Sequence, residues 1–400
     1  MIMKYPALKP ACNVRWTLAG FGLALVSLLL VFQLLPDGFN TKSFHISSPK
    51  DSEQSTLKNT EGSCKGSATI PNIVHFVHLV KPSPNPTFEF PFRQFIAIYS
   101  AWYYLQPETI NIYTNVEEHL IEETIKRSTS PWTKAVSKLP KVKVSHHTPP
   151  DHTTSGEAIP KLPNQSDFVR TGILREFGGI YLDEDAYVLR DLAPLRRMGF
   201  QNVVGYQLNG QICPAVILST PGNKLMEWYH ALQHKAFNPN RWALHATDLL
   251  STLAMDFQEP DDQVLVLPHN TFFPYYWRGN DLKPICQVHD KDLDAPDAVT
   301  NKGTQNLTEY SENFHLYGPE ALESWKTDLR SSYVLHGWTS GIETEFNDQE
   351  RDAMFRKFGG ITPDFVLAQS SNFARAVYPA FKHALDNGVL DGIEYNQSQP

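Results

Sequence analysis

The sequence has little of what nucleic-acid-binding and zinc-binding proteins require. Its formal net charge is −8, and its basic residues form no run longer than the pair Arg196–Arg197. Because nucleic-acid-binding domains carry a basic patch or stripe, this charge argues against a nucleic-acid partner. The four cysteines lack the spacing of a zinc site, and the chain contains no internal repeat. What remains is an ordinary globular composition, 41% hydrophobic and 20% charged, which allows a sizeable core.

One long apolar run without charge lies near the N-terminus. It extends over about 20 residues, from Trp16 to Leu35, which is enough to span a bilayer as a helix. Lys4, Lys9 and Arg15 precede it, and because positive residues stay cytoplasmic, the rest of the chain is expected in the lumen. The alternative is a cleaved signal peptide, but its apolar region is usually only about 7–15 residues and ends at a small-residue site. We therefore expect a single-pass type II protein of the Golgi membrane, with a cytoplasmic tail (1–15), a signal anchor (16–35) and a lumenal catalytic domain.

This topology would place three of the four cysteines in an oxidising compartment. Cys12 would be cytoplasmic, whereas one disulfide could form among Cys64, Cys213 and Cys286, and one thiol would be left over. The sequence does not choose the partners. Three sequons, which the secretory lumen permits to be glycosylated, begin at Asn164, Asn306 and Asn396.

The order of the segments predicts an α/β fold. Residues 36–68 are polar and rich in Ser and Thr, which indicates a flexible stem. A β-branched, apolar segment from Ile70, "IPNIVHFVHLV", reads as a buried strand. The segment from Phe92 to Leu105 has helical apolar spacing, and "ETINIYTN" alternates like a second strand. A strand, a helix and a strand open a nucleotide-binding α/β sheet, mostly parallel and flanked by helices, which we expect over residues 69–345. Residues 346–400 are expected to form a helical extension or a tail.

The stretch "SDFVRTGILREFGGIYLDEDAYVLRDL" predicts a helix that runs into a central strand. Ser166 is a suitable N-cap, and Asp167 and Arg170 lie one turn apart in the helix. Gly178 is the expected left-handed end of the helix, and Gly179 lets the chain turn into the strand. The buried stripe of this helix is expected to consist of Val169, Ile173 and Phe177.

Three acids follow the strand formed by residues 180–182. Ligands bind at the carboxyl ends of strands in open α/β sheets. If the strand continues, Asp183 and Asp185 point the same way, about 6–7 Å apart, and Glu184 points to the opposite face. Two close carboxylates repel unless a cation lies between them, and Mn²⁺ or Mg²⁺ is the natural partner, because it can bind carboxylates and substrate phosphates together. A calcium-binding loop is a poorer interpretation, because "DEDAYVLRDL" lacks the glycine that an EF-hand needs.

The same stretch closely resembles the sugar-binding Asp-x-Asp region of glycosyltransferase family 32, and more distantly the glucosyltransferase domains of large clostridial toxins. "IPNIVHFVHL" and "AWYYLQPETINIYTN" resemble the family's first strand and its following helix and strand, and "YVLHGWTSGI" its closing loop. The resemblance covers roughly residues 70–340. It implies a GT-A fold and transfer of a sugar with retention at the anomeric carbon.

The resemblance also implies roles for individual residues at the donor. Asp167 and Arg170 would contact donor-sugar hydroxyls, Tyr181 would line the nucleotide pocket, and the indole N–H of Trp338 would bind the leaving phosphate. Each has a structural alternative. Asp167 could be a first-turn acid favoured by the helix dipole, Arg170 a surface ion pair and Trp338 a core residue.

At the metal, the resemblance implies that Asp185 binds the ion directly. Asp183 would contact the donor and reach the metal through water, and His336 would be the third protein ligand or a diphosphate contact. Asp183 and Asp185 would thus be the catalytic pair, although His336 could also be a buried core histidine. No carboxylate can be assigned as a nucleophile or base from the sequence.

Together these features predict a retaining, metal-dependent hexosyltransferase. The donor would be GDP-mannose or a UDP-hexose, and the acceptor a glycan, a glycolipid or a glycoprotein. The alternative is a membrane-tethered carbohydrate-binding protein that has the fold but no turnover. Asp185→Asn is expected to abolish transfer without unfolding the metal-free protein, which could even gain stability, because one repulsive carboxylate is removed.

Overall fold

The computed structural model describes residues 69–257, 264–289 and 325–398. The expected cytoplasmic tail, membrane anchor and stem, and the sequon at Asn306, lie outside these residues. Within the described ranges, no helix combines the length and the apolar character that a membrane crossing requires.

The central element is a seven-stranded sheet with the order β3-β2-β1-β4-β7-β6-β8. Its pairs are parallel except at β7, which runs antiparallel to both β4 and β6. A second, two-stranded sheet pairs β5 with β9. This is the α/β fold with a mixed, mostly parallel sheet that the sequence predicted. The strand bounds are β1 Ile73–Val77, β2 Thr109–Thr114, β3 Val142–His146, β4 Gly179–Leu182, β5 Ala186–Val188, β6 Asn202–Gly205, β7 Val216–Ser219, β8 Val264–Leu267 and β9 Val334–His336.

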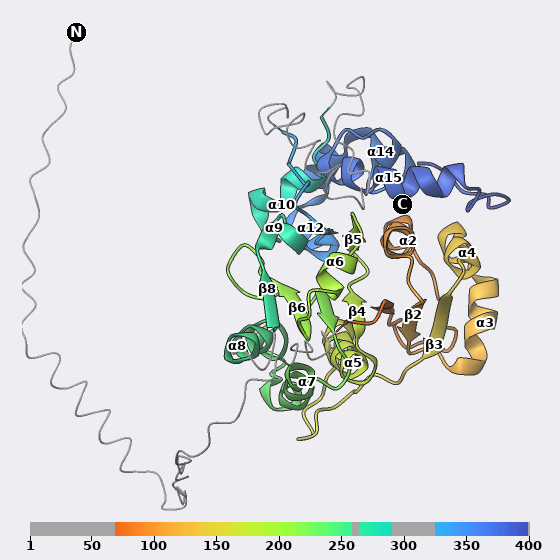
Figure 1. The fold of residues 1–400 in the computed structure, drawn as a ribbon. Coiled ribbons are helices and arrows are strands. Elements are labelled where there is room, and N and C mark those ends of the chain that lie inside the picture. Colours follow the sequence, from red (N-terminus) through yellow and green to blue (C-terminus); the bar gives the residue numbers. More distant parts are fainter. Residues whose placement is uncertain (1–68, 258–263, 290–324, 399–400) are drawn as a thin grey trace, which may run out of the picture. The chain divides into compact units, whose positions relative to one another are not determined.

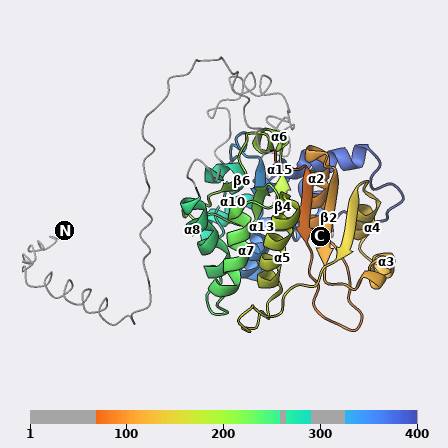
Figure 2. The same cartoon turned by 60° about the horizontal axis from the view of Figure 1, so that its bottom comes forward.

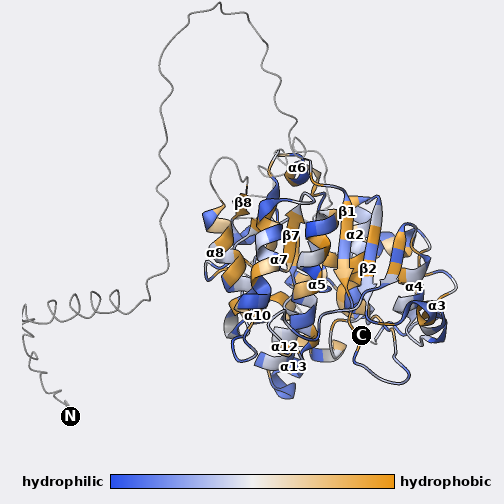
Figure 3. Ribbon diagram, turned by 90° about the horizontal axis from the view of Figure 1, so that it is seen from below, coloured by the Kyte–Doolittle hydropathy of each residue, from blue (hydrophilic) through white to orange (hydrophobic). Residues whose placement is uncertain are grey.

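Helices cover both faces of the large sheet (Figure 1). Successive side chains of β4 point to opposite faces of the sheet, and both faces are apolar. Ile180 and Leu182 belong to the core under α2 and α15, whereas Tyr181 belongs to the core under α5, α7 and α8. Strands β1 and β7 are mostly orange in Figure 3, while the surrounding helices mix both colours, as expected for strands buried on both faces. The helix bounds are α2 Phe92–Leu105, α3 Glu118–Arg127, α4 Pro131–Lys138, α5 Leu162–Phe177, α6 Ala193–Arg196, α7 Lys224–Ala236, the π-helix η1 Leu244–Asp248, α8 Leu249–Asp256, α9 His269–Phe272, α10 Gly279–Cys286, α12 Thr339–Glu345, α13 Asp348–Phe355, the 3₁₀ turn η4 Arg356–Phe358, α14 Pro363–Leu367 and α15 Asn372–Asp386.

The C-terminal segment is helical and belongs to the same compact unit as the sheet. The ring of Phe381 on α15 contacts the ring of Phe92 on α2 at 4.9 Å, and the hydroxyl of Tyr99 lies 2.8 Å from His383 Nδ1. Figure 2 shows α15 beside α2. Up to residue 398, the described part of this segment thus contains helices and packs against α2.

Two local predictions are wrong. Helix α5 begins at Leu162, with Lys161 as its N-cap, so Ser166 lies inside the helix. Pro163 does not delay the helix, because the first turn needs no N–H donor. Phe177 is 46% exposed, so the buried face of the helix ends at Leu174. The sequence left the pairing of the cysteines open; Cys213 and Cys286 are buried free thiols, and Cys64 lies outside the described residues.

Candidate functional site

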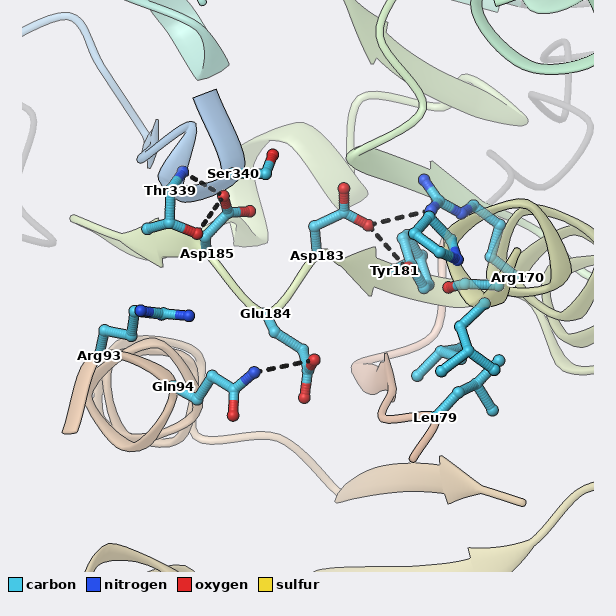
Figure 4. A pocket seen from close by; sticks show the side chains of 14 residues that line it. Leu79, Arg93, Gln94, Arg170, Tyr181, Asp183, Glu184, Asp185, Thr339 and Ser340 are labelled. Atoms are coloured by element: carbon cyan, nitrogen blue, oxygen red, sulfur yellow. Dashed lines mark hydrogen bonds and ion pairs between the residues drawn. The ribbon is translucent and has the colours of Figure 1, made fainter. Parts of the chain in front are cut away.

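The acids form a tight turn between two strands of different sheets. Strand β4 ends at Leu182, and β5 begins at Ala186, whose backbone N–H donates to the carbonyl of Asp183 at 2.9 Å. The sequence predicted that the acids follow the end of this strand, and β4 does end at Leu182. The turn keeps Asp183 and Asp185 on one side and turns Glu184 away from them (Figure 4).

Two glycines set the position of β4. Gly178 ends α5 with φ 62° and ψ −156°, so its φ is positive as predicted, but the chain leaves the helix in an extended form. Gly179 has φ +99°, and a Cβ there would lie 2.5 Å from the carbonyl oxygen of Ile73 on β1. The buried His75 reinforces this close approach, since its Nε2 lies 2.8 Å from the Gly178 carbonyl oxygen. Only glycine permits this direct passage from helix to central strand.

One oxygen of Asp183 is held by protein donors. Its Oδ1 accepts from the Tyr181 hydroxyl at 2.7 Å and lies 3.2 Å from Arg170 NH2. The Arg170 guanidinium is buried, lies over the Tyr181 ring at 4.6 Å and donates from NH1 to the carbonyl of Pro214. Burial opposes ionisation of Asp183, but Arg170 and His336 outweigh it, so the pKa of Asp183 is lowered. Asp183 is therefore a fixed carboxylate.

One oxygen of Asp185 is held in the same way from the other side. Its Oδ2 accepts from the backbone N–H and the hydroxyl of Thr339, at 2.9 and 3.1 Å. Thr339 begins α12, three residues after the end of β9. Burial again opposes ionisation, but His336 and Thr339 outweigh it, so the pKa of Asp185 is lowered. The other oxygen, Oδ1, points toward β9.

His336, the last residue of β9, lies between the two free oxygens. Its Nε2 is 3.1 Å from Asp185 Oδ1 and 3.7 Å from Asp183 Oδ2. Burial alone would lower the pKa of His336, but the charge of Asp185 and then that of Asp183 raise it to about 9. Neither ring nitrogen makes a hydrogen bond of acceptable geometry, although both are buried.

This group fits a divalent cation. Each of the three residues offers one ligand atom, and the three atoms lie within 4.8 Å of one another. Two carboxylates and an imidazole with no hydrogen bond of its own form a donor set for a metal of the Mn²⁺ type, and Mg²⁺ is compatible with the carboxylates. The structure thus brings together Asp183, Asp185 and His336, as the sequence predicted.

The carboxylates face a cavity of about 410 Å³ at the carboxyl ends of β1 and β4. The order of strands reverses between β1 and β4, and in open α/β sheets this is where ligands bind. Arg170, predicted to contact the donor, and Tyr181, predicted to line the pocket, both border the cavity. Its walls are formed by Val77, Leu79, Arg93, Gln94, Leu162, Pro163, Ser166, Arg170, Tyr181, Asp183, Glu184, Asp185, Thr339 and Ser340.

Glu184 also borders this cavity, which the sequence did not indicate. It accepts from His78 Nδ1 at 2.6 Å. It also accepts from Gln94 Nε2 at 3.1 Å (Figure 4). Both partners come from the β1–α2 region, about 90 or more residues earlier in the chain. No local pattern could have shown these contacts.

Two predicted donor contacts are placed differently. The Trp338 indole N–H donates to the carbonyl of Tyr275 at 3.0 Å, so in this arrangement it is not free for a phosphate. Asp167 is not a first-turn acid and is not among the residues that line the cavity. It is buried, and its carboxylate oxygens lie 3.0 Å from Arg170 NH2 and 3.0 Å from His245 Nε2. No pattern in the sequence pointed to His245.

Comparison with known proteins agrees with this geometry. Residues 95–204 match the family described as "Glycosyltransferase sugar-binding region containing DXD motif". This part of the chain is therefore similar to that family. The DXD motif of the matched region is Asp183–Glu184–Asp185. The resemblance to a sugar-binding Asp-x-Asp family, which was predicted from the sequence, is thus confirmed.

The sugar-binding region lies within a longer similarity to a fungal protein. The chain is 25% identical over 306 residues to "Glucan organizing enzyme 1" of Cryptococcus neoformans var. grubii, covering 72% of this chain and 78% of the relative. Solved structures with partial similarity include PaToxG glycosyltransferase, with TM-score 0.35, 14% identity and coverage of 47% of this chain and 70% of that one. Glycosyltransferase GlyE of Streptococcus pneumoniae TIGR4 has TM-score 0.38, 12% identity and coverage of 83% and 66%.

Proposed function

We propose that this glycosyltransferase is metal-dependent and moves a hexose from a nucleotide sugar to a glycan, glycolipid or glycoprotein acceptor. The observation that carries the proposal is the arrangement of Asp183, Asp185 and His336. Each carboxylate has one oxygen held by protein donors and a second oxygen directed toward His336. A GT-A fold and retention at the anomeric carbon complete the proposal; they rest on the resemblance to family 32.

The cavity supports binding of a nucleotide sugar. Its volume of about 410 Å³ lies within the usual range of about 300–1,000 Å³ for ligand sites. Val77, Leu79 and Tyr181 supply apolar surface, and the acids lie beside it. When bound, Mn²⁺ or Mg²⁺ would hold the donor diphosphate and stabilise the charge that develops as it leaves.

The chain's own residues prepare this site. Arg170 and Tyr181 fix Asp183, and Thr339 fixes Asp185, so the free oxygens need no reorientation when an ion enters. His336 must release a proton before its ring nitrogen can bind a metal ion, because the proton and the ion compete for the same lone pair. The buried guanidinium of Arg170 also offsets part of the negative charge that the acids place beside an anionic donor.

We further propose that the enzyme is anchored in the Golgi membrane with its catalytic domain in the lumen. The uncharged run 16–35 and the basic residues before it support this topology. Protection of the C-terminal part from protease in sealed microsomes would agree with it. Digestion of that part from outside would contradict the type II orientation.

Hydrolysis of a panel of nucleotide sugars with Mn²⁺ tests the proposed activity. We expect turnover of one GDP- or UDP-linked hexose, loss of turnover with a chelator, and recovery when Mn²⁺ is added back. Asp185→Asn should be inactive, whereas Glu184→Gln, which removes the same charge one residue away, should retain more activity. Binding of the donor by the wild type without hydrolysis or transfer would instead support a carbohydrate-binding protein.

A further inference from the structure

His245 is a buried polar residue that the proposed chemistry does not use. It has no exposed surface, and its ring stacks on Phe168 at 5.6 Å with an angle of 11° between the planes. A second ring, Phe237, contacts it edge-on at 5.0 Å. His245 lies on the short π-helix η1, and such insertions into helices are frequent at functional sites.

The contact between His245 and Asp167 has a defined direction. Nε2 lies 3.0 Å from Asp167 Oδ2, and because a carboxylate oxygen only accepts, the imidazole must donate. The other nitrogen, Nδ1, is buried and has no hydrogen-bond partner among the described residues. A position that served packing alone would favour an apolar ring, since an unpaired buried nitrogen costs free energy. The hydrogen bond to Asp167 therefore accounts for a histidine here.

Asp167 contacts both His245 and Arg170, so the hydrogen bond from His245 also affects the position of Arg170. While Oδ2 accepts from His245, Oδ1 faces Arg170 NH2 at 3.0 Å. The same NH2 group lies 3.2 Å from Oδ1 of Asp183, so one nitrogen bridges the two carboxylates. If Asp167 rotated, NH2 would lose one of the two partners that hold it in place.

Arg170 in turn contacts Asp183, one of the proposed metal ligands. Because Arg170 and Tyr181 hold Oδ1 of Asp183, Oδ2 is left directed toward His336. We propose that His245 is a positioning residue which, through Asp167 and Arg170, fixes the free oxygen of Asp183 for the divalent ion. This inference rests on the proposed metal site, and it gives Asp167 a supporting role that the family resemblance did not imply.

The test is Mn²⁺ binding to the purified protein without donor or acceptor, measured by electron paramagnetic resonance of free Mn²⁺. His245→Phe keeps the ring stack but removes the donor. Residues that support metal ligands typically change affinity by about 10–100-fold when replaced, and His245 acts at a distance, so we expect about a tenfold loss. The matched control is His230→Phe, because His230 contacts Thr171 Oγ1 at 2.9 Å and not Asp167.

The result supports the inference if His245→Phe weakens Mn²⁺ binding, His230→Phe does not, and thermal unfolding shows both variants folded. His245→Gln, which can still present an N–H to Asp167, should recover part of the affinity. If His245→Phe does not fold, His245→Asn replaces it, since it is polar but too short to reach Asp167. Wild-type affinity in the folded variant overturns the inference and leaves the metal site standing. No Mn²⁺ binding by the wild type overturns both.

Discussion

Asp185→Asn should destabilise the metal-free protein at pH 6 and not at pH 10. The substitution keeps the shape of the side chain, and an amide oxygen can still accept from Thr339. It removes the charge that faces His336 at 3.1 Å. The variant thus isolates the ion pair between Asp185 and His336.

The magnitude follows from the pKa of His336. Its rise from 6.5 to about 9 corresponds to about 3 kcal/mol, because one pKa unit is worth about 1.4 kcal/mol. Asp185 is the nearer of the two carboxylates, so its removal should cost about 1–3 kcal/mol. The lowered pKa of Asp185 expresses the same interaction and is not added again.

The sign of the pH dependence is fixed by the direction of the shift. The folded-state pKa of His336 lies above its unfolded value, so its contribution to stability is complete below about pH 6.5 and disappears as the pH rises through about 9. At pH 10 the wild type keeps a buried carboxylate without its cationic partner. The free energy of unfolding of Asp185→Asn should then equal or exceed that of the wild type. The predicted loss of stability at pH 6 differs from the sequence-based expectation that the metal-free variant could gain stability, because His336 and Thr339 lower the pKa of Asp185.

Urea unfolding with a chelator at pH 6 and pH 10 measures this difference. The wild type should exceed Asp185→Asn in free energy of unfolding at pH 6, and the gap should close at pH 10. Equal destabilisation at both pH values, or a more stable variant at pH 6, would refute the reasoning.

Three further predictions concern other parts of the fold. Glu184→Gln should lower the free energy of unfolding by about 1 kcal/mol, because one of its two part-buried hydrogen bonds is disturbed. Mn²⁺ titration of this variant should give wild-type affinity, and a large loss of affinity would count Glu184 among the ligands. Gly179→Ala should lower the free energy of unfolding by more than the roughly 1–3 kcal/mol of backbone strain alone, since its Cβ would meet a carbonyl oxygen at 2.5 Å. Gly156→Ala is the control, because it introduces the backbone strain at a site with open space around the new Cβ. Equal free energies of unfolding for the two variants would contradict this prediction. Expressed in a secretory host, the chain should carry a glycan at the exposed Asn396 rather than at Asn164, which is 4% exposed within α5; peptide mass spectrometry showing high occupancy at Asn164 would mean that α5 is placed wrongly.

Local patterns were sufficient to predict the first elements of the domain. The apolar segment at β1, the helical spacing of α2 and the alternation in β2 each depend on neighbouring residues, and all three elements form. The end of α5 was predictable because a double glycine permits few other backbones. Its start was not, because Ser166 and Lys161 both precede plausible first turns, and the packing of the helix decides between them.

The supporting contacts of the site depend on residues far apart in the sequence. His245 lies 78 residues from Asp167, and Thr339 lies 154 residues from Asp185. The Asp-x-Asp pattern predicted which residues could bind a cation, but not which oxygen each would offer. That choice is made by Arg170, Tyr181 and Thr339, through contacts that exist only after folding.

A crystal soaked with Mn²⁺ and a nucleoside diphosphate, measured at the manganese absorption edge, tests the central claim most directly. We predict one anomalous peak within bonding distance of Asp183, Asp185 and His336, in contact with the diphosphate, and no peak in Asp185→Asn. A peak elsewhere, or none at this group in a protein that hydrolyses its donor, would contradict the assignment of these residues as the metal site.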